Sequence, residues 1–368
     1  MSVRESSVLA LVRSEPMISQ EAMAQRLGIS RSAVAGHIMS LTKKGIIEGR
    51  GYVLSASPFV VVIGGANIDI HGMPAHKLVE GDSNVGTVLT CAGGVARNIA
   101  ENLSRLGTHV RLLAPIGLDK YGDFLHQHSV DAGVDMSFVL RHPSLSTSTY
   151  LSILNHQGSM QVAISDMAIM DSLSPAYLKN HEAMLKQAEL MVIDCNLSEE
   201  TLEYLLTSFP DQAKFVDTVS TRKALKIKPY LKGVHTLKPS FAEARALADI
   251  KGKKADDLPR LADWFHEQGV ERLVISLGDA GVFCSSAQEQ ATHEAIKTSK
   301  PVNTDGAGDA FVAGLAFAKL QQWDTPRSIG FAQAAAAVTI SDKSTNNSAL
   351  SIQQVEKVYQ NHYVNSTE

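Results

Sequence analysis

The chain has 368 residues, of which 44% are hydrophobic and 20% charged, and its formal net charge is −4. This composition is ordinary for a protein that buries a full core, and the length suits one large and one small domain. The sequence contains no run of eighteen apolar residues and no signal peptide, so we expect a cytoplasmic protein without membrane contact. The three cysteines are too few and too far apart to suggest a disulfide framework or a zinc site.

The charge is distributed unevenly along the chain. Residues 1–50 hold seven Lys or Arg against four Asp or Glu, a balance of +3, and the remainder carries −7. We therefore expect the two parts of the chain to meet different partners.

The first part carries three helical patterns. Apolar residues at helical spacing predict helices over residues 4–13, 20–27 and 31–44. Ser19 and Ser30 stand where the N-caps of the second and third helices fall, with a glycine turn between those two helices. This arrangement is typical of a helix-turn-helix.

Residues 46–54 have the pattern of two short strands around a glycine turn, as the wing of a winged helix does. We expect residues 1–57 to form a winged helix-turn-helix domain that binds duplex DNA as a homodimer. A small helical unit of this kind also serves as a dimerisation or partner-docking module, and that alternative remains open. The candidate DNA-binding residues are Arg31, Ser32, His37, Lys43 and Lys44, with Arg50 in the wing.

From residue 58 onward, short apolar runs alternate with helical patterns. This alternation favours an α/β domain over residues 58–368, built on a doubly wound parallel sheet with helices on both faces. The expected strands are 59–63, 110–114, 190–194, 214–217, 235–237 and 272–277, and the expected helices include 97–106, 198–208, 241–247 and 258–268. Two stretches, near 70–91 and 139–164, break the alternation, and their Ser, Thr and apolar residues predict strands with one wet face.

A glycine turn, a carboxylate and a helix start come together at residues 302–315. Gly306, Ala307 and Gly308 predict a loop whose backbone N–H groups approach an anion at the N-terminus of the following helix. Asp309, in the first turn, is placed to accept the proton of a substrate hydroxyl as a general base. Taken alone, the pattern fits equally well an aspartate that caps a helix after a glycine turn.

A second glycine motif, Gly93-Gly94-Val95-Ala96-Arg97-Asn98, lies about 200 residues earlier and is followed by Gly107 and Gly117. The two motifs in this order resemble the two signatures of the ribokinase (PfkB) family of sugar and nucleoside kinases. The resemblance extends from residue 59 to the end of the chain. Within the family the sequence is most similar to pseudouridine kinases, through residues 63–70, 82–86 and 93–107. The resemblance implies a ribokinase-like fold in which the two exceptional stretches form a small β lid over the sugar.

The resemblance also implies where the phosphate acceptor binds. Asn67 and Asp69 follow the first strand at its C-terminal end, where ligands of open α/β sheets bind, and the family's aspartate at this place grips the sugar hydroxyls. Thr149 and Tyr150 could contact the base, but an ordinary pair of strand residues explains them equally well. The candidate substrate-binding residues are Asn67, Asp69, Gly93, Gly94, Asn98 and Thr149.

On the nucleotide side, residues 237–243 stand where the family usually has Asn-x-x-Glu, a motif that helps to position magnesium and phosphate. Ser240 replaces the Asn, whereas Glu243 keeps the acidic position and is expected to act on the metal through water. The polar residues at 194–196 and 217–220 either face the phosphate channel or cap helices. The candidate nucleotide-binding residues are Ser220, Lys238, Gly278 and Thr304. Asn303 stands where many members have an aspartate that holds a monovalent cation, which argues against potassium activation.

The sequence therefore predicts an ATP- and magnesium-dependent kinase that transfers the terminal phosphate to the ribose primary hydroxyl of a nucleoside, pseudouridine first. Asp309 would be the base, and the glycine-loop amides would stabilise the transferring phosphoryl group. A kinase of another nucleoside or of a free sugar remains open. So does a transcription regulator whose kinase fold senses a ligand, although the presence of Asp309 and the glycine loop favours an active enzyme.

Overall fold

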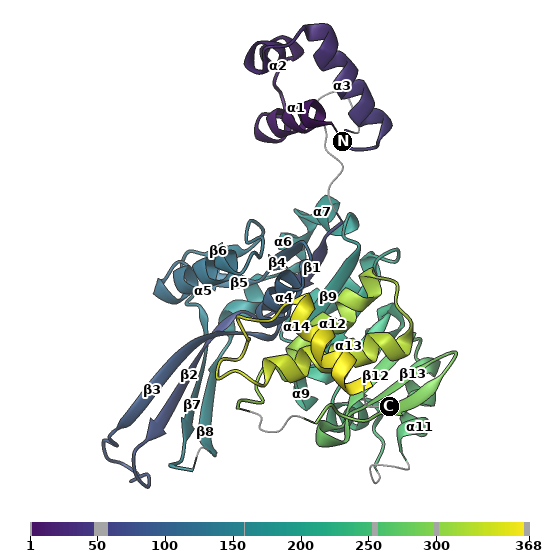
Figure 1. Ribbon diagram of the computed structural model, residues 1–368. Helices are drawn as coiled ribbons and strands as arrows, with labels where there is room; N and C mark the ends of the chain where they lie inside the picture. Colours follow the sequence, from purple (N-terminus) through teal and green to yellow (C-terminus); the bar gives the residue numbers. More distant parts are fainter. Residues whose placement is uncertain (1, 48–57, 158, 252–256, 298–301, 364–368) are drawn as a thin grey trace. The chain divides into compact units, whose positions relative to one another are not determined.

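The computed structural model describes residues 2–47, 58–157, 159–251, 257–297 and 302–363. The chain divides into two compact units, Met1–Pro58 and Phe59–Glu368. The first unit consists of short helices, and the second combines helices with a large sheet and a group of projecting strands (Figure 1). None of the helices within the described ranges is long and apolar enough to cross a membrane.

The N-terminal unit contains α1 (Val3–Ser14), α2 (Gln20–Leu27) and α3 (Arg31–Lys43). Each helix follows a serine whose side chain accepts a backbone hydrogen bond from the first turn, and these N-caps are Ser2, Ser19 and Ser30. The three helices lie where their apolar spacing predicted them.

The helices of this unit enclose a small core to which each contributes, including Val8, Met23, Val34 and Leu41. Gly28 ends α2 in the left-handed conformation, which makes the tight turn before α3. The predicted wing falls largely on residues 48–57, and those, Arg50 included, lie outside the described residues.

The second unit is organised around an eight-stranded sheet in the order β14-β13-β12-β11-β10-β9-β1-β4. Six of these strands are parallel to one another and correspond to the predicted apolar runs. They are β1 (Val60–Ile63), β4 (Val110–Leu113), β9 (Leu190–Asp194), β10 (Ala213–Asp217), β11 (Thr236–Lys238) and β12 (Arg272–Ser276). All four residues of β1 are buried, as a strand covered on both faces requires. The sheet is mixed rather than wholly parallel, because β13 (Val282–Ser286) and β14 (Gln290–His293) run antiparallel at one edge.

Helices cover both faces of this sheet. One core contains Val60 and Val62 with residues of α4 (Val95–Arg105), α12 (Ala307–Leu320) and α13 (Thr325–Thr339). The other contains Val61 and Ile63 with residues of the helices that follow β9 to β11. The remaining helices are α5 (Lys120–Asp131), α6 (Pro175–Lys179), α7 (Glu182–Lys186), α8 (Glu199–Ser208), α9 (Thr221–Ala224), α10 (Phe241–Ala248), α11 (Leu258–Glu267) and α14 (Ile352–Tyr363), with short 3-10 turns η1 (Ala168–Ser172), η2 (Leu225–Gly233) and η3 (Gly278–Ala280).

A separate four-stranded sheet, which we call the lid, projects from the body of the second unit (Figure 1). Its order is β3-β2-β7-β8, and the strands are β2 (Asn67–Pro74), β3 (Gly86–Gly93), β7 (Ser148–Leu154) and β8 (Met160–Asp166). The two stretches that broke the alternation thus supply the lid, except that β6 (Leu140–His142) pairs with β5 (Pro115–Gly117) in a two-stranded sheet of its own.

The register of the lid decides which side chains share a face. Asp69 on β2 pairs with Cys91 on β3 and with Tyr150 on β7. Because side chains alternate along a strand, these residues lie on one face, together with Asn67 and His71. Ile68 and Ile70 point to the other face. We call the first the inner face and the second the outer face.

Candidate active site

The glycine loop opens helix α12. Gly306 is its N-cap with φ 78°, and a Cβ there would lie 2.0 Å from the carbonyl oxygen of Thr345, so a glycine is required at this turn. Ala307 and Gly308 begin the helix, and Asp309 falls in its first turn. The loop therefore presents the free N–H groups of a helix N-terminus beside a carboxylate.

Asp309 is held by its neighbours in a way that suits a general base. Its Oδ2 accepts a hydrogen bond of 2.8 Å from Nδ2 of Asn98 on α4. Burial raises the pKa of Asp309 to about 7, with a further contribution from the charge of Asp217, while Asn98 and Lys238 act in the opposite direction. A carboxyl with a pKa near neutrality is well matched to accepting a hydroxyl proton.

Lys238 brings a positive charge to the same loop. Its Nζ lies 3.1 Å from Oδ2 of Asp217, and a Cβ added to Gly308 would be 3.0 Å from that Nζ. Burial by itself lowers the pKa of Lys238, but the nearby carboxylates of Asp217, Asp309 and Glu243 outweigh it, so the pKa is raised. The charged ammonium and the helix N-terminus together form a site for an anion.

The inner face of the lid supplies a second carboxylate. Nδ2 of Asn67 donates a hydrogen bond of 2.6 Å to Oδ1 of Asp69. A Cβ at Gly93 would lie 2.0 Å from Oδ2 of Asp69, so only glycine leaves room for this side chain. Burial raises the pKa of Asp69, and the hydrogen bond from Asn67 opposes that shift. Gly94 follows as the N-cap of α4, and the same helix carries Asn98, which contacts Asp309.

Arg97 holds the backbone of the glycine motif through hydrogen bonds, a role that sequence reasoning missed. Its side chain is 1% exposed, and it donates hydrogen bonds to the carbonyl oxygens of Gly93 and Ala92 at 2.8 and 2.9 Å. The guanidinium also pairs with Glu101 at 2.7 Å. The spacing of Arg97 and Glu101, four residues apart on one face of α4, was the available signal.

Other polar residues at the strand ends hold backbone instead of facing the loop. Asp194 accepts hydrogen bonds from the N–H groups of Gly65, Ala96 and Asn196 at 2.8, 3.0 and 2.8 Å. Ser220 caps α9, accepting from the N–H of Lys223. These contacts display a backbone-holding role for Asp194 and a capping role for Ser220, whereas Asp217 pairs with Lys238 beside the glycine loop.

Glu243 forms a capping box at the start of α10. Its Oε2 accepts from the N–H of Ser240 at 2.8 Å and from Oγ1 of Thr218 at 2.6 Å. Within the described ranges no three His, Cys, Asp or Glu side chains gather as a metal cage. Mg²⁺ commonly binds through one or two carboxylates, water and substrate phosphates, and this donor set fits that mode.

A cavity of about 750 Å³ lies between α12, α13 and the antiparallel edge of the sheet. Three of the four predicted nucleotide-binding residues, Lys238, Gly278 and Thr304, line it, together with Gly308 from the glycine loop. Ser220 is not among its lining residues. We call this space the α12–α13 cavity. Its size suits a nucleotide-sized ligand, and its inner end meets the anion site.

The lid register separates Thr149 and Tyr150, for which contact with a nucleobase and an ordinary strand pair were both left open. Thr149 pairs with Ile68 and so lies on the outer face, whereas Tyr150 pairs with Asp69 and lies on the inner face. His71 and Ser152, which the sequence analysis did not single out, share the inner face and are joined by a hydrogen bond of 2.6 Å. The spacing of Asn67, Asp69 and His71 at alternate positions was the signal for them.

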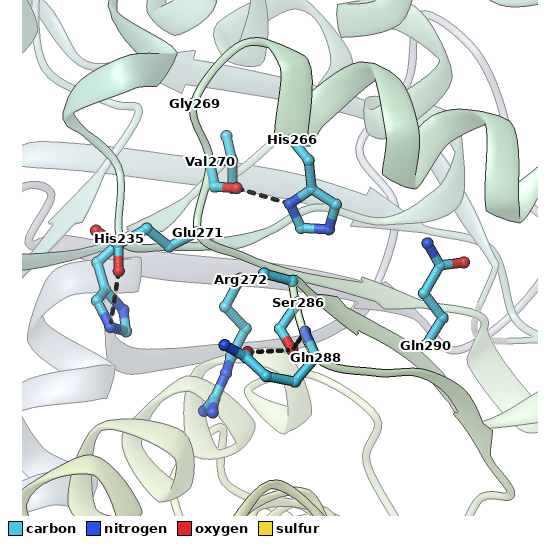
Figure 2. Close-up of a pocket in the computed structure, with 10 residues that line it drawn as sticks. His235, His266, Gly269, Val270, Glu271, Arg272, Ser286, Gln288 and Gln290 are labelled. Atoms are coloured by element: carbon cyan, nitrogen blue, oxygen red, sulfur yellow. Dashed lines mark hydrogen bonds and ion pairs between the residues drawn. The ribbon is translucent and has the colours of Figure 1, made fainter.

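A second hollow, of about 600 Å³, lies where β11 and β12 begin, away from the strand ends that carry Lys238 and Asp217. Figure 2 shows His266 directed at the carbonyl oxygen of Val270, 2.8 Å away, and its other ring nitrogen is 2.7 Å from Oγ of Ser285. None of the predicted site residues lines this hollow. Ligands of open α/β sheets bind at the carboxyl ends of the strands, so this is not the active site.

The predicted DNA-binding residues lie along α3 and just beyond it. Arg31, Ser32 and Lys43 are exposed, and His37 is half-buried. Lys44 differs from these residues because it forms an ion pair within the unit: its Nζ lies 2.7 Å from Oε1 of the buried Glu5. Lys44, then Ser40 and Ser2, lower the pKa of Glu5 to about 2. Lys44 thus stabilises the unit whatever else it does.

The fold and the site define a class of protein: a kinase that phosphorylates a small, hydroxyl-bearing molecule. The chain belongs to the pfkB family of carbohydrate kinases, whose model matches residues 57–352, and residues 4–53 match a helix-turn-helix domain. It is accordingly a phosphotransferase that acts on a sugar or a nucleoside.

Similar proteins agree with this assignment. An uncharacterized sugar kinase, YeiI, of Escherichia coli K12 is 40% identical over 95% of this chain and 97% of its own length. The pseudouridine kinase of the same organism is 39% identical over 82% of this chain and 97% of its own. Among solved structures, Arabidopsis thaliana ribokinase with ribose and ATP superposes with a TM-score of 0.77 at 20% identity, covering 83% of this chain and 99% of that one. That last likeness concerns the fold.

Proposed function

We propose that this protein is an ATP-dependent nucleoside kinase that phosphorylates the primary ribose hydroxyl of pseudouridine. The observation that carries the proposal is the chain of contacts from Asp69 on the lid, past Gly93 and along α4, to Asn98 and Asp309. These contacts support the assignment of Asp69 as a diol-binding carboxylate and of Asp309 as a base on two sides of one acceptor site. The 39% identity to a pseudouridine kinase supports the choice of acceptor.

The reaction follows from the positions of these groups. Asp69 and Asn67 bind the ring hydroxyls and leave the primary hydroxyl pointing to Asp309. Asp309 takes the hydroxyl proton as the oxygen attacks the γ-phosphorus, and the bond from phosphorus to the β,γ-bridging oxygen breaks, releasing ADP. Lys238 and the N–H groups of residues 306–308 stabilise the charge on the transferring phosphoryl group.

ATP would occupy the α12–α13 cavity, with its phosphates toward Gly308 and Lys238. Gly278 and Thr304 line the same cavity and would contact the nucleotide. Mg²⁺ would enter with the phosphates, and Glu243 would reach it through water. Bound there, the ion would neutralise phosphate charge.

A second candidate is a kinase of another nucleoside or of a free sugar. It is favoured by the 40% identity to a sugar kinase, which exceeds the identity to the pseudouridine kinase by one point. The two candidates differ only in what the inner face of the lid accepts beyond the ribose, where Tyr150, His71 and Ser152 lie.

The test is phosphate transfer from Mg-ATP to a panel of pseudouridine, uridine, cytidine, inosine, adenosine, ribose and fructose. Pseudouridine should give the highest kcat/KM, and Asp309→Asn should lower turnover by about two to four powers of ten while ATP binding persists. A higher kcat/KM for a free sugar would replace the first candidate by the second. No turnover with any acceptor, despite ligand binding, would favour a regulator that senses the ligand.

Two further roles belong to the same proposal. Residues 1–57 would bind duplex DNA through Arg31, Ser32, His37 and Lys43, since an exposed basic helix suits the major groove.

The protein would act as a homodimer. Support for the dimer comes from the outer face of the lid, where Val88, Val162 and Ile164 are 70%, 55% and 64% exposed. An apolar sheet face of this kind is covered in most proteins.

A further inference from the structure

We propose that Tyr363, in the last turn of α14, is a positioning residue for the nucleotide, acting through Gln333 on the wall of the α12–α13 cavity. The inference rests on the proposed function, because the ligand concerned is ATP. It concerns a residue far along the chain from both glycine motifs.

Gln333 lies in the middle of α13, is 6% exposed and lines the cavity. Its Nε2 donates hydrogen bonds to the carbonyl oxygens of Glu294 and His293, at 3.0 and 3.4 Å. The residues that follow, 295–297, line the cavity opposite α13. The Gln333 amide therefore connects α13 to the segment 293–297 on the other side of the cavity.

The hydroxyl of Tyr363 completes this arrangement by hydrogen bonding to Oε1 of Gln333. An amide oxygen can only accept, so the phenol is the donor. With its oxygen engaged, the amide must turn both N–H hydrogens toward the two carbonyl oxygens. Burial raises the pKa of Tyr363 to about 12, so the phenol keeps its donating proton at neutral pH.

Helix α14 is itself anchored on α13, which fixes where the hydroxyl lies. Gly330 leaves room for the rings of Tyr359 and Tyr363, since a Cβ there would come within 2.6 and 3.0 Å of them. The two rings are 5.3 Å apart and lie one helical turn from each other. Tyr359 thus shares the packing of Tyr363, and the amide contact belongs to Tyr363.

Loss of the hydroxyl should therefore affect nucleotide binding selectively. Oε1 of Gln333 would lose its donor, the amide could rotate, and the carbonyl oxygens of His293 and Glu294 would be released. Asp309 and Asp69 are held by α4 and the lid instead, so proton transfer and acceptor binding would not change. A net hydrogen bond of this type corresponds to an increase of about two- to tenfold in the Kd and KM for ATP.

The experiment compares Tyr363→Phe with Tyr359→Phe, which removes a hydroxyl from the neighbouring ring and leaves the Gln333 contact intact. Calorimetry with Mg-ATP and no acceptor gives the Kd, and steady-state rates give kcat and both KM values. Tyr363→Phe should weaken ATP binding with kcat at saturating ATP unchanged. Gln333→Leu should weaken it similarly, and the double variant should lose little more than either single one, because both remove one contact.

Three results would overturn the inference. One is ATP binding by Tyr363→Phe that equals that of the wild type or of Tyr359→Phe. Another is a fall in kcat with the KM for ATP unchanged, and the third is additive losses in the double variant. Wild-type protein that binds no ATP would defeat the proposed function together with this inference. If ATP binds and the predicted pattern holds, the inference stands even when the acceptor is not pseudouridine.

Discussion

Nδ2 of Asn98 donates a hydrogen bond of 2.8 Å to Oδ2 of Asp309 across a sequence separation of 211 residues. The contact joins α4, whose first turn follows the glycine motif beside Asp69, to α12, which carries the proposed base. Because α4 contacts both ends of the proposed acceptor site, it sets the separation between Asp69 and Asp309 that a substrate would have to span. Changes on this helix should therefore affect the acceptor more than the nucleotide.

Asp309→Asn should reduce kcat by two to four powers of ten, the usual contribution of a general base, and leave ATP binding intact. It should also stabilise the fold above neutral pH. Burial raises the pKa of this carboxyl from its ordinary value of 3.8 to about 7 in the folded protein, so the free energy of unfolding falls as the pH rises between these values. Removing the charge should restore roughly 4 kcal/mol at pH 8, because one pKa unit corresponds to about 1.4 kcal/mol. Asp305→Asn, in the same loop, is the control, and urea unfolding with acceptor turnover measures both effects.

The pH dependence of kcat/KM should report the same carboxyl. Activity should rise with pH through about 7, because Asp309 must lose its proton before it can accept one. Asn98→Ala removes the hydrogen bond that stabilises the charged form, so the limb should move to higher pH. An acidic limb that stays in place in Asn98→Ala would assign it to another group.

Much of the fold and part of the candidate site could be predicted from the sequence, because they depend on local sequence patterns. The helices at residues 4–13 and 20–27, the buried strands and the first-turn position of Asp309 follow from spacing and turn chemistry alone. The face on which Thr149 lies could not be predicted, since it depends on lid register and a shift of one residue reverses it. Nor could the antiparallel edge, or the burial of Arg97, because both depend on partners distant in sequence.

Arg97→Gln should weaken acceptor binding and destabilise the protein. It frees the carbonyl oxygens of Ala92 and Gly93 and takes one partner from the buried Glu101, a change worth roughly 3–5 kcal/mol at buried ion pairs. Arg105→Gln is the matched control, because Arg105 pairs with the same Glu101 from a side chain that is 20% exposed. Equal losses in the two variants, by urea unfolding and acceptor KM, would mean that the glycine motif does not depend on Arg97.

Lys43 and Lys44 should differ in their effect on DNA binding. Lys43 is exposed, so Lys43→Gln in the whole chain should reduce the slope of log affinity against log salt by about one for a mixed-sequence duplex. Lys44→Gln should instead destabilise the N-terminal unit, since the lowered pKa of Glu5 gives stability above pH 4.5 that is lost as the pH falls toward 2. Fluorescence anisotropy and thermal melting separate the two effects. Equal changes in slope would show that both lysines contact phosphate.

Ile164→Glu should convert the proposed dimer into a monomer in sedimentation at micromolar concentration. Ile164 lies on the outer face of the lid, as Val162 does, and a charge there would have to be buried without a partner. Ser165→Glu places the same charge on the adjacent residue of the strand, pointing to the inner face, and should leave the dimer intact. A monomeric wild type, or equal dissociation by both variants, would show that the outer face is not the contact. In that case a dimer on DNA would have to form through another surface.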